Sequence, residues 1–346
     1  MMARPEGGSM QAVVVTGGAG YIGSHIVKRL LGDGRRVIVI DDLTEGHAAA
    51  VGDADLVQAR CGDRGVLREV LGAGGIGCVV HMAASCAVGE SMQDPAKYYE
   101  NNVEQSLALL DACREHAVGG IVFSSTAAVY GEPQAVPITE DHPQLPTNPY
   151  GETKHLFERA LEWYRRAYGT RWIALRYFNA AGAHPDGTLG EDHSPEGHLV
   201  PRLLKAVIDG GPPTPIFGED YPTSDGTCVR DYVHVVDLAE AHLLALRALE
   251  HGSVDGQAFN LGNGGGFSVR EVVDAVAQVA GSPPPTAAAP RRAGDPAILV
   301  ASSEAARRRL GWTPSLPELD SIVRTAWEWH RSRPRGYDDR GSEARR

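Results

Sequence analysis

The sequence predicts an α/β protein in which a doubly wound parallel sheet carries a smaller mixed α/β lobe at its C-terminal side. Three observations lead to this fold class. Short β-branched runs alternate with longer helical patterns, a glycine-rich turn follows the first run, and the alternation ends after about Ala180. These features are typical of the Rossmann arrangement. The predicted strands span residues 12–15, 37–40, 55–59, 78–81, 121–124 and 173–176.

Helical patterns between the runs, including residues 97–116 and 150–168, predict right-handed crossovers. Residues 11–180 are therefore interpreted as the Rossmann domain, whose sheet we expect later segments to complete. Residues 181–337 are interpreted mainly as the second lobe, closing over the carboxyl edge of the sheet. The segment 281–289, rich in Pro and Ala, is predicted to be a surface connection, and residues 1–10 and 338–346 are predicted to be disordered tails.

Composition excludes several classes of protein. The 346 residues carry a net charge of −11 with dispersed Lys and Arg, so a nucleic-acid partner is not expected. Apolar runs are shorter than a membrane span of ~18 residues, and the N-terminus does not resemble a secretion signal. The five cysteines form no CxxC pair, so neither a disulfide framework nor a metal site is expected. These observations predict a cytoplasmic protein without a membrane partner.

The glycine-rich turn after the first strand indicates a dinucleotide site. Gly17, Gly20 and Gly23 precede an amphipathic helical pattern, and glycines there let the backbone approach a pyrophosphate at the helix N-terminus. A glycine turn alone can also mark an ordinary tight loop. Asp41 ends the second strand, where it can accept hydrogen bonds from a ribose and repel a 2′-phosphate, which favours NAD over NADP. Asp63, after the third strand, is placed to receive an adenine amino group.

A second constellation predicts acid–base chemistry. Tyr150 and Lys154 are four residues apart on one helix face, so both can point into one site. A tyrosine at its ordinary pKa of ~10 is too rarely ionised at pH 7 to act as a base, and a nearby ammonium would lower that pKa. Thr126 follows the fifth strand, where ligands collect in such sheets. The alternative interpretations are that the spacing of Tyr150 and Lys154 arises by chance on a helix, and that Thr126 only caps the end of a strand.

With these residues in this order, the chain resembles the extended short-chain dehydrogenase/reductase superfamily and, within it, the UDP-glucose 4-epimerase family. The motifs that narrow the resemblance are HMAA (81–84), VGES (88–91), NNV (101–103), RYFN (176–179) and, above all, YPTSDGTCVRDYVHV (221–235). The resemblance covers nearly the whole chain. It implies an NAD-dependent, homodimeric enzyme that oxidises C4 of UDP-glucose or UDP-galactose, lets the 4-keto sugar rotate and reduces it again.

The resemblance also implies a set of site residues. Thr126, Tyr150 and Lys154 would be catalytic. Those holding NAD would be Gly17, Gly20, Tyr21, Ile22, Gly23, Asp41, Asp42, Asp63, Arg64, Met82, Ala83, Ala84, Cys86, Asn101, Thr126, Tyr150, Lys154, Tyr177 and Phe178. Those contacting the UDP-sugar would be Thr126, Tyr150, Asn179, His198, Leu199, Phe217, Arg230, Arg292, Asp295 and Leu299.

Three positions depart from the pattern of many relatives. Cys86 stands where many carry a lysine at the cofactor phosphates, His198 replaces an asparagine, and Thr126 replaces a serine but keeps the hydroxyl. The loss of a lysine at Cys86 implies that backbone groups compensate there.

Rival activities leave distinct signals. Dehydratases and decarboxylases of the superfamily place carboxylates just after the threonine of this strand, whereas Ala127 and Ala128 stand here, which favours epimerisation. A catalytically silent NAD-sensing protein would not need the intact Thr126, Tyr150 and Lys154. Whether the enzyme also accepts N-acetylhexosamines is decided by the size of the side chain at Leu299 or at one of its two neighbours. A branched side chain there is expected to limit the room beside C2 of the hexose.

Overall fold

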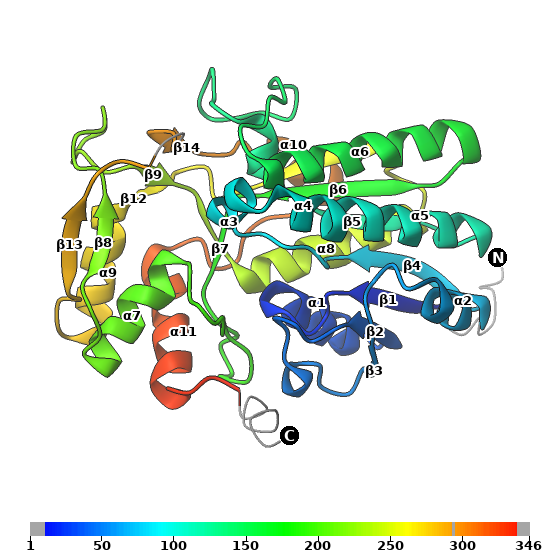
Figure 1. Cartoon of the computed structure of the whole chain (residues 1–346), viewed down its shortest axis with the longest axis horizontal. Helices are drawn as coiled ribbons and strands as arrows, with labels where there is room; N and C mark the ends of the chain where they lie inside the picture. Colours follow the sequence, from blue (N-terminus) through cyan, green and yellow to red (C-terminus); the bar gives the residue numbers. More distant parts are fainter. Residues whose placement is uncertain (1–10, 293–294, 338–346) are drawn as a thin grey trace, which may run out of the picture.

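The chain forms a seven-stranded parallel sheet covered by helices on both faces (Figure 1). The computed structural model describes residues 11–292 and 295–337, so the tails predicted at 1–10 and 338–346 lie outside the described residues. The strand order is β11-β6-β5-β4-β1-β2-β3. The strands are β1 (Ala12–Thr16), β2 (Val37–Asp41), β3 (Asp55–Gln58), β4 (Ile76–His81), β5 (Ile121–Thr126), β6 (Trp172–Tyr177) and β11 (Gln257–Leu261).

All six predicted strands form, and their ends differ from the prediction by one or two residues. The seventh strand, β11, forms one edge of the sheet and pairs in parallel with β6. Its sequence QAFNL shows no clear period because Asn260 is buried and hydrogen-bonded inside the protein: Oδ1 accepts from Tyr130 (2.7 Å) and Nδ2 donates to the Ile138 carbonyl (3.0 Å). A buried, satisfied polar residue hides a strand from hydrophobic patterning.

Helices cover both faces of the sheet, as parallel strands require. On one face α1 (Tyr21–Gly32) and α8 (Val235–Glu250) pack together, with Ile26 and Leu246 in a common core. On the other face lie α2 (Arg64–Gly72), α5 (Gln105–Glu115) and α6 (Pro149–Tyr168). The helix predicted at 150–168 is confirmed as α6. The one predicted at 97–116 is divided into α4 (Pro95–Tyr98), a π-helical stretch (Tyr99–Glu104) and α5.

The start of α6 is specified by local sequence. Asn148 caps it, since its Oδ1 accepts the Gly151 N–H at 2.8 Å, and Pro149 takes the first helical position, where no amide donor is needed. Gly169 ends the helix in the left-handed conformation (φ +76°). Because both ends are signalled, the first turn, which carries Tyr150, is held against the end of β5.

The smaller lobe has its own core, in which α7 (Leu199–Asp209), α9 (Val269–Ala280) and α11 (Leu319–Ser332) pack together. The prediction of a plain connection over residues 281–289 was wrong for the second half of that segment. There β13 (Thr286–Ala289) pairs in parallel with β8 (Thr214–Phe217). Strand pairing overrides the low β propensity of its alanines. The remaining elements are β7 (Asn179–Ala181), β8 (Thr214–Phe217), β9 (Val229–Arg230), β10 (Tyr232–His234), β12 (Phe267–Ser268), β13 (Thr286–Ala289), β14 (Ile298–Leu299), α3 (Val88–Gln93), α10 (Glu304–Leu310) and the 3-10 turns Ala48–Ala50 and Ala127–Tyr130.

This lobe stands beyond the carboxyl ends of the main-sheet strands, on the left of Figure 1, where the sequence predicted a closing lobe. In the part of the chain that the structure describes, no helix combines the length and apolar character needed to cross a bilayer.

Candidate active site

A cleft of about 780 Å³ opens between the carboxyl edge of the main sheet and the smaller lobe. Its wall includes Gly20 and Tyr150 from the first half of the chain and Arg230 and Leu299 from the second half. Ligands of doubly wound sheets bind at this edge, and the volume suits a ligand larger than a single sugar.

The turn between β1 and α1 is shaped to receive a phosphate group. Gly17 has φ +70°, and a Cβ there would lie 2.6 Å from Ala83 N, while a Cβ on Gly23 would lie 2.0 Å from Gly17 O. A Cβ on Gly20 would meet Gly17 O at 3.5 Å and would otherwise fill the cleft. Because α1 begins without a side-chain cap, its first amides are available to an anion. These features fit the pyrophosphate of NAD.

Asp41 lies at the end of β2 on the cleft wall, where it is only 8% exposed. Its two carboxylate oxygens accept the amides of Ala19 and Leu43, each at 2.9 Å. Burial raises the pKa of Asp41, and the two amide hydrogen bonds oppose that rise. Each oxygen keeps a second lone pair, so Asp41 can still accept a ribose hydroxyl as predicted.

Most of the predicted cofactor residues line the cleft, and Asp63 and Arg64 do not. Of the residues that the structure describes, the wall includes Gly17, Gly20, Tyr21, Ile22, Gly23, Asp41, Asp42, Met82, Ala83, Ala84, Cys86, Asn101, Thr126, Tyr150, Lys154, Tyr177 and Phe178. Asp63 instead caps α2, accepting the amides of Gly65 (2.8 Å) and Val66 (3.1 Å). Its contact with adenine therefore remains a prediction, as does any role of Arg64.

Thr126, Tyr150 and Lys154 meet at the carboxyl end of β5 and all line the cleft. Thr126 Oγ1 accepts the Ala128 amide at 3.1 Å, which leaves its own O–H to donate to a second partner. Thr126 therefore caps the strand end, as the alternative interpretation held, and it also lines the cleft. Burial raises the pKa of the Tyr150 phenol well above its ordinary value, whereas the hydrogen bond with Thr126 lowers it.

Lys154 carries a buried ammonium group that is only 3% exposed. Its Nζ donates to the Ser124 carbonyl at 2.9 Å, and burial lowers its pKa to about 8. The same strand end places the Ser124 hydroxyl in a short hydrogen bond with the Tyr177 hydroxyl. Ser124 lines the cleft, and the sequence analysis did not assign it a site role. A site role for Ser124 could have been inferred from its position near the end of the strand that also carries Thr126.

The π-helical stretch of residues 99–104 anchors the loop that follows β4. Asn101 Nδ2 donates to Ser85 Oγ at 3.0 Å, and Asn102 brackets the Ser85 backbone, accepting its N–H (2.8 Å) and donating to its carbonyl (2.9 Å). Asn102 also donates to Thr153 on α6 (3.1 Å). The π geometry therefore lets two consecutive asparagines hold one loop. Asn101 was predicted, whereas Asn102 was missed because hydrogen bonds across elements leave no sequence period.

The smaller lobe contributes a buried cation to the cleft. Arg230 on β9 forms a short ion pair with Asp295, and both line the wall, as do the predicted Asn179 and His198. Leu299 of β14 is paired with Arg230 and packs beside Phe178 in the cluster around Tyr130. Of the three neighbours that the sequence left open, Leu299 is the one on the cleft wall.

Three predicted substrate residues lie outside the described wall of this cleft: Leu199, Phe217 and Arg292. Leu199 is the first residue of α7, next to His198. The Arg292 guanidinium stacks on the Phe217 ring with 3.9 Å between Cζ and the ring centroid. Their contacts with a uridine remain predictions.

This fold and site define a dinucleotide-dependent enzyme of the short-chain dehydrogenase/reductase type, with a Thr-Tyr-Lys set beside a phosphate-binding turn. The chain belongs to the NAD dependent epimerase/dehydratase family, whose sequence model matches residues 13–262. Its cofactor is NAD, as the glycine turn and Asp41 predicted.

Individual relatives agree with this assignment. A UDP-glucose 4-epimerase of Halalkalibacterium halodurans is 52% identical over 328 residues, which cover 94% of this chain and 97% of the relative. The crystal structure of UDP-glucose 4-epimerase from Brucella ovis in complex with NAD has a TM-score of 0.89 at 47% identity, covering 92% and 97% of the two chains. The enzyme from Bifidobacterium longum in complex with NAD+ and UDP has a TM-score of 0.88 at 37% identity, covering 94% and 100%.

Proposed function

We propose that the protein interconverts UDP-glucose and UDP-galactose by inverting C4 of the hexose, with NAD as a resident cofactor. The observation that carries this proposal is the meeting of Thr126, the last residue of β5, with Tyr150 from the first turn of α6. Ala127 and Ala128 follow Thr126 on the cleft wall. Proton transfer groups are present there, while the strand end lacks the carboxylates that elimination or decarboxylation would use. The epimerase activity of the relatives described above supports the same assignment.

Bound along the glycine turn, NAD would supply a reversible hydride acceptor for the sugar carbon. The chain's own residues handle the proton. Thr126 donates a hydrogen bond to the reacting oxygen and orients it, and Tyr150 removes the proton of the sugar hydroxyl and later returns it. Because Tyr150 serves both half-reactions, no net proton is consumed.

Tyr150 acts as a base only when positive charge gathers around it. Burial alone keeps the phenol protonated, and Lys154, one helical turn away, is the cation on the same face of α6. The Ser124 carbonyl holds that ammonium at the floor of the cleft (2.9 Å). In a desolvated site an ammonium favours the phenolate more strongly than in water. We propose that Lys154, together with bound NAD, lowers the pKa of Tyr150 toward the working pH.

Epimerisation also requires tight binding of the nucleotide and weak binding of the hexose, because the oxidised sugar must rotate in the site without dissociating. Arg230 is proposed to bind the diphosphate, since a guanidinium keeps its charge and offers several donors. Asp295, Asn179 and His198 are proposed to contact the rest of the UDP, and Leu299 to bound the hexose pocket. Leu199, Phe217 and Arg292 are proposed to act at the uridine end.

The direct test is incubation of purified protein with UDP-galactose and no added cofactor, followed by separation of the nucleotide sugars. We expect UDP-glucose to form and NAD to copurify with the protein. Appearance of a 4-keto-6-deoxy sugar would contradict the assignment. A silent NAD-sensing protein would bind both ligands and leave the UDP-galactose unchanged.

Three further proposals accompany this function. The protein is a homodimer, it works in the cytoplasm, and residues 11–180 and 181–337 divide mainly into an NAD-binding and a UDP-sugar-binding part. The resemblance to the epimerase family supports the first, the composition supports the second, and the position of the cleft between the two lobes supports the third. A second candidate activity, on N-acetylhexosamines as well, depends on the bulk of Leu299.

A further inference from the structure

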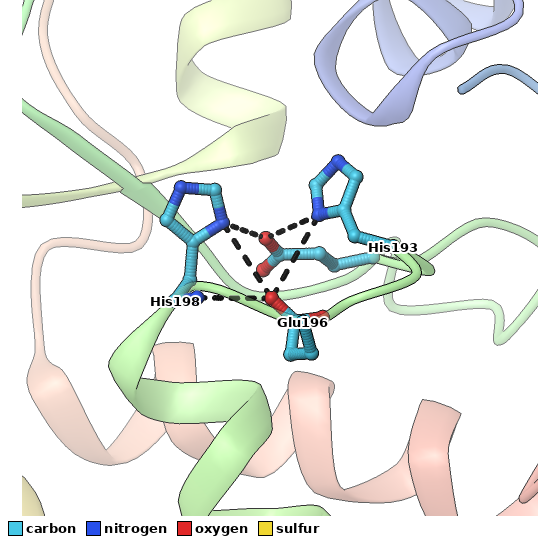
Figure 2. Close-up of side chains that lie close together, drawn as sticks. His193, Glu196 and His198 are labelled. Carbon is cyan, nitrogen blue, oxygen red and sulfur yellow. Dashed lines mark hydrogen bonds and ion pairs between the residues drawn. The ribbon is translucent and has the colours of Figure 1, made fainter. Parts of the chain in front are cut away.

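Four metal-ligand side chains from the connection between β7 and α7 converge beside the cleft, and Figure 2 shows three of them labelled around a shared carboxylate. Their ligand atoms all lie within 4.8 Å of one another. We name this group the His/Glu cluster; its members are Glu191, His193, Glu196 and His198.

The spacing of these atoms is close to that of a tetrahedral site. His193 Nδ1 lies 3.2 Å from Glu191 Oε1 and 3.8 Å from Glu196 Oε1, and His198 Nδ1 lies 3.8 Å from Glu196 Oε1 and closer to Glu191 Oε1. Zinc bonds of ~2.0–2.2 Å in a tetrahedron separate neighbouring ligand atoms by ~3.3–3.5 Å. The separations in the metal-free cluster lie on either side of this value, so a bound zinc ion would require the four atoms to adjust to it.

The metal-free cluster leaves its polar groups poorly matched. Both imidazoles share the single oxygen Glu191 Oε1, and their ring centroids lie only 5.5 Å apart. Among the described residues, the buried Glu196 Oε2 has no hydrogen-bond donor, although the Lys205 ammonium stands 3.6 Å away. The Glu196 side chain is 8% exposed and that of Glu191 is 4% exposed. Buried carboxylates require a positive partner.

The backbone around the cluster is held in place independently of any ligand. The Glu191 carbonyl accepts the Trp329 indole N–H (3.3 Å), and the Asp192 carboxylate accepts the Tyr337 amide (3.0 Å). The His198 amide donates to Glu196 Oε1 (3.0 Å). A site whose ligands are already oriented loses little entropy when a metal binds.

We propose that the His/Glu cluster binds one divalent cation, most suitably Zn²⁺. Two imidazole nitrogens and two carboxylate oxygens are a ligand set that zinc accepts in tetrahedral geometry. Zinc binds unprotonated Nδ1 atoms, so any proton held there passes to solvent when the ion binds. The cysteine pattern, which gave no sign of zinc, does not bear on this site.

The ion would be structural and would stiffen one side of the cleft. His193 and His198 both line the cleft, and the Tyr21 ring of the phosphate-binding turn lies 6.3 Å from the His193 ring between centroids. Zinc held at both Nδ1 atoms leaves the Nε2–H of His198 to donate to a ligand. This consequence rests on the proposed function, in which His198 contacts the UDP-sugar, whereas the metal site itself does not.

The test is zinc binding to the untagged, chelator-treated full-length chain, measured by elemental analysis and by competition with a chromophoric chelator. We expect one zinc per chain, and we expect Co²⁺ at the same site to show the intense visible absorption of tetrahedral cobalt. The variants His193→Gln and, separately, Glu196→Gln should each weaken zinc binding by at least ~100-fold, since loss of a ligand exceeds the effect of an outer-shell change.

The matched control is His184→Gln. His184 belongs to the same connection but pairs with Asp186 (2.7 Å) outside the cluster, so this variant should bind zinc like the unmodified chain. Circular dichroism checks that all variants fold. The proposal is overturned if the unmodified chain takes up no zinc, if zinc binds both cluster variants as tightly as the control, or if bound cobalt is octahedral; histidine–carboxylate ion pairs alone would then explain the cluster. Epimerase activity is scored separately, so failure of the proposed function would not alter the zinc stoichiometry.

Discussion

Lys154 carries a buried charge that opposes folding at neutral pH, and Lys154→Met is expected to relieve it. Burial lowers the pKa of the ammonium from 10.5 to about 8. A difference of this size corresponds to ~3 kcal/mol of destabilisation at pH 7, where the lysine is protonated in both the folded and the unfolded chain. No discount for solvent screening applies, because the residue is only 3% exposed.

The direction of the pH dependence follows from the lower pKa in the folded state. Between about pH 8 and 10.5 the unfolded chain holds more protons, so the free energy of unfolding of the unmodified protein rises with pH there. K154M lacks this proton. Its advantage over the unmodified chain should therefore shrink by ~2 kcal/mol between pH 7 and 9.5. Loss of the hydrogen bond to Ser124 costs ~1–3 kcal/mol at every pH and offsets the absolute gain without changing this trend.

The assay is urea unfolding of the NAD-free chain, followed by circular dichroism at several pH values. Lys97→Met is the matched control, because Lys97 is solvent-exposed and its hydrogen bond with Glu90 raises its pKa instead of lowering it. Parallel stability curves for K154M and the unmodified chain would refute the reasoning, since they would show that the ammonium is not desolvated. K154M should also lose at least ~100-fold in turnover, with the remaining activity shifted to higher pH, because the pKa of Tyr150 rises when the cation is removed.

Substitutions at three other positions test the site. Tyr150→Phe should lower turnover by at least ~100-fold with UDP affinity nearly unchanged, and near-normal turnover would place the base elsewhere. The unmodified enzyme should prefer UDP-galactose to UDP-N-acetylgalactosamine by roughly 10- to 100-fold in kcat/KM, because the N-acetyl group meets Leu299 in a clash of ~1–3 kcal/mol. Leu299→Ser should narrow this ratio, whereas Leu299→Met should keep it. Equal kcat/KM values in the unmodified enzyme would widen the assignment to dual specificity. Arg230→Ala should raise KM for UDP-galactose by at least ~10-fold with a smaller change in kcat, and an unchanged KM would remove Arg230 from the diphosphate.

Sequence patterns predicted the elements whose signals are local. The strand β1 is a continuous β-branched or apolar run, β5 begins with such a run, and α6 is bounded by a capping asparagine and a terminal glycine, so each can be recognised within its own segment. The placement of Tyr150 and Lys154 on one helix face follows from the helical period alone. The glycine turn and Asp41 favoured NAD, and the resemblance to the epimerase family implied the same cofactor.

The tertiary structure decided what depends on contacts between distant segments. It showed that β11 completes the sheet beside β6, that β13 is a strand, and that Asp63 is used to cap a helix. These outcomes depend on pairing partners and on hydrogen bonds that a polar side chain finds only after the chain has folded, so no period in the sequence records them.

By itself, therefore, the sequence determined the class of fold, the phosphate-binding turn and the Thr126-Tyr150-Lys154 set, because each follows from a short segment with its own geometric period. Only the tertiary structure chose Leu299 over its neighbours, paired Arg230 with Asp295 and gathered the His/Glu cluster beside the turn. The physical reason is that a side chain's neighbours, and hence its pKa and its ligands, are set by packing across the whole chain, whereas backbone conformation is largely set by nearby residues.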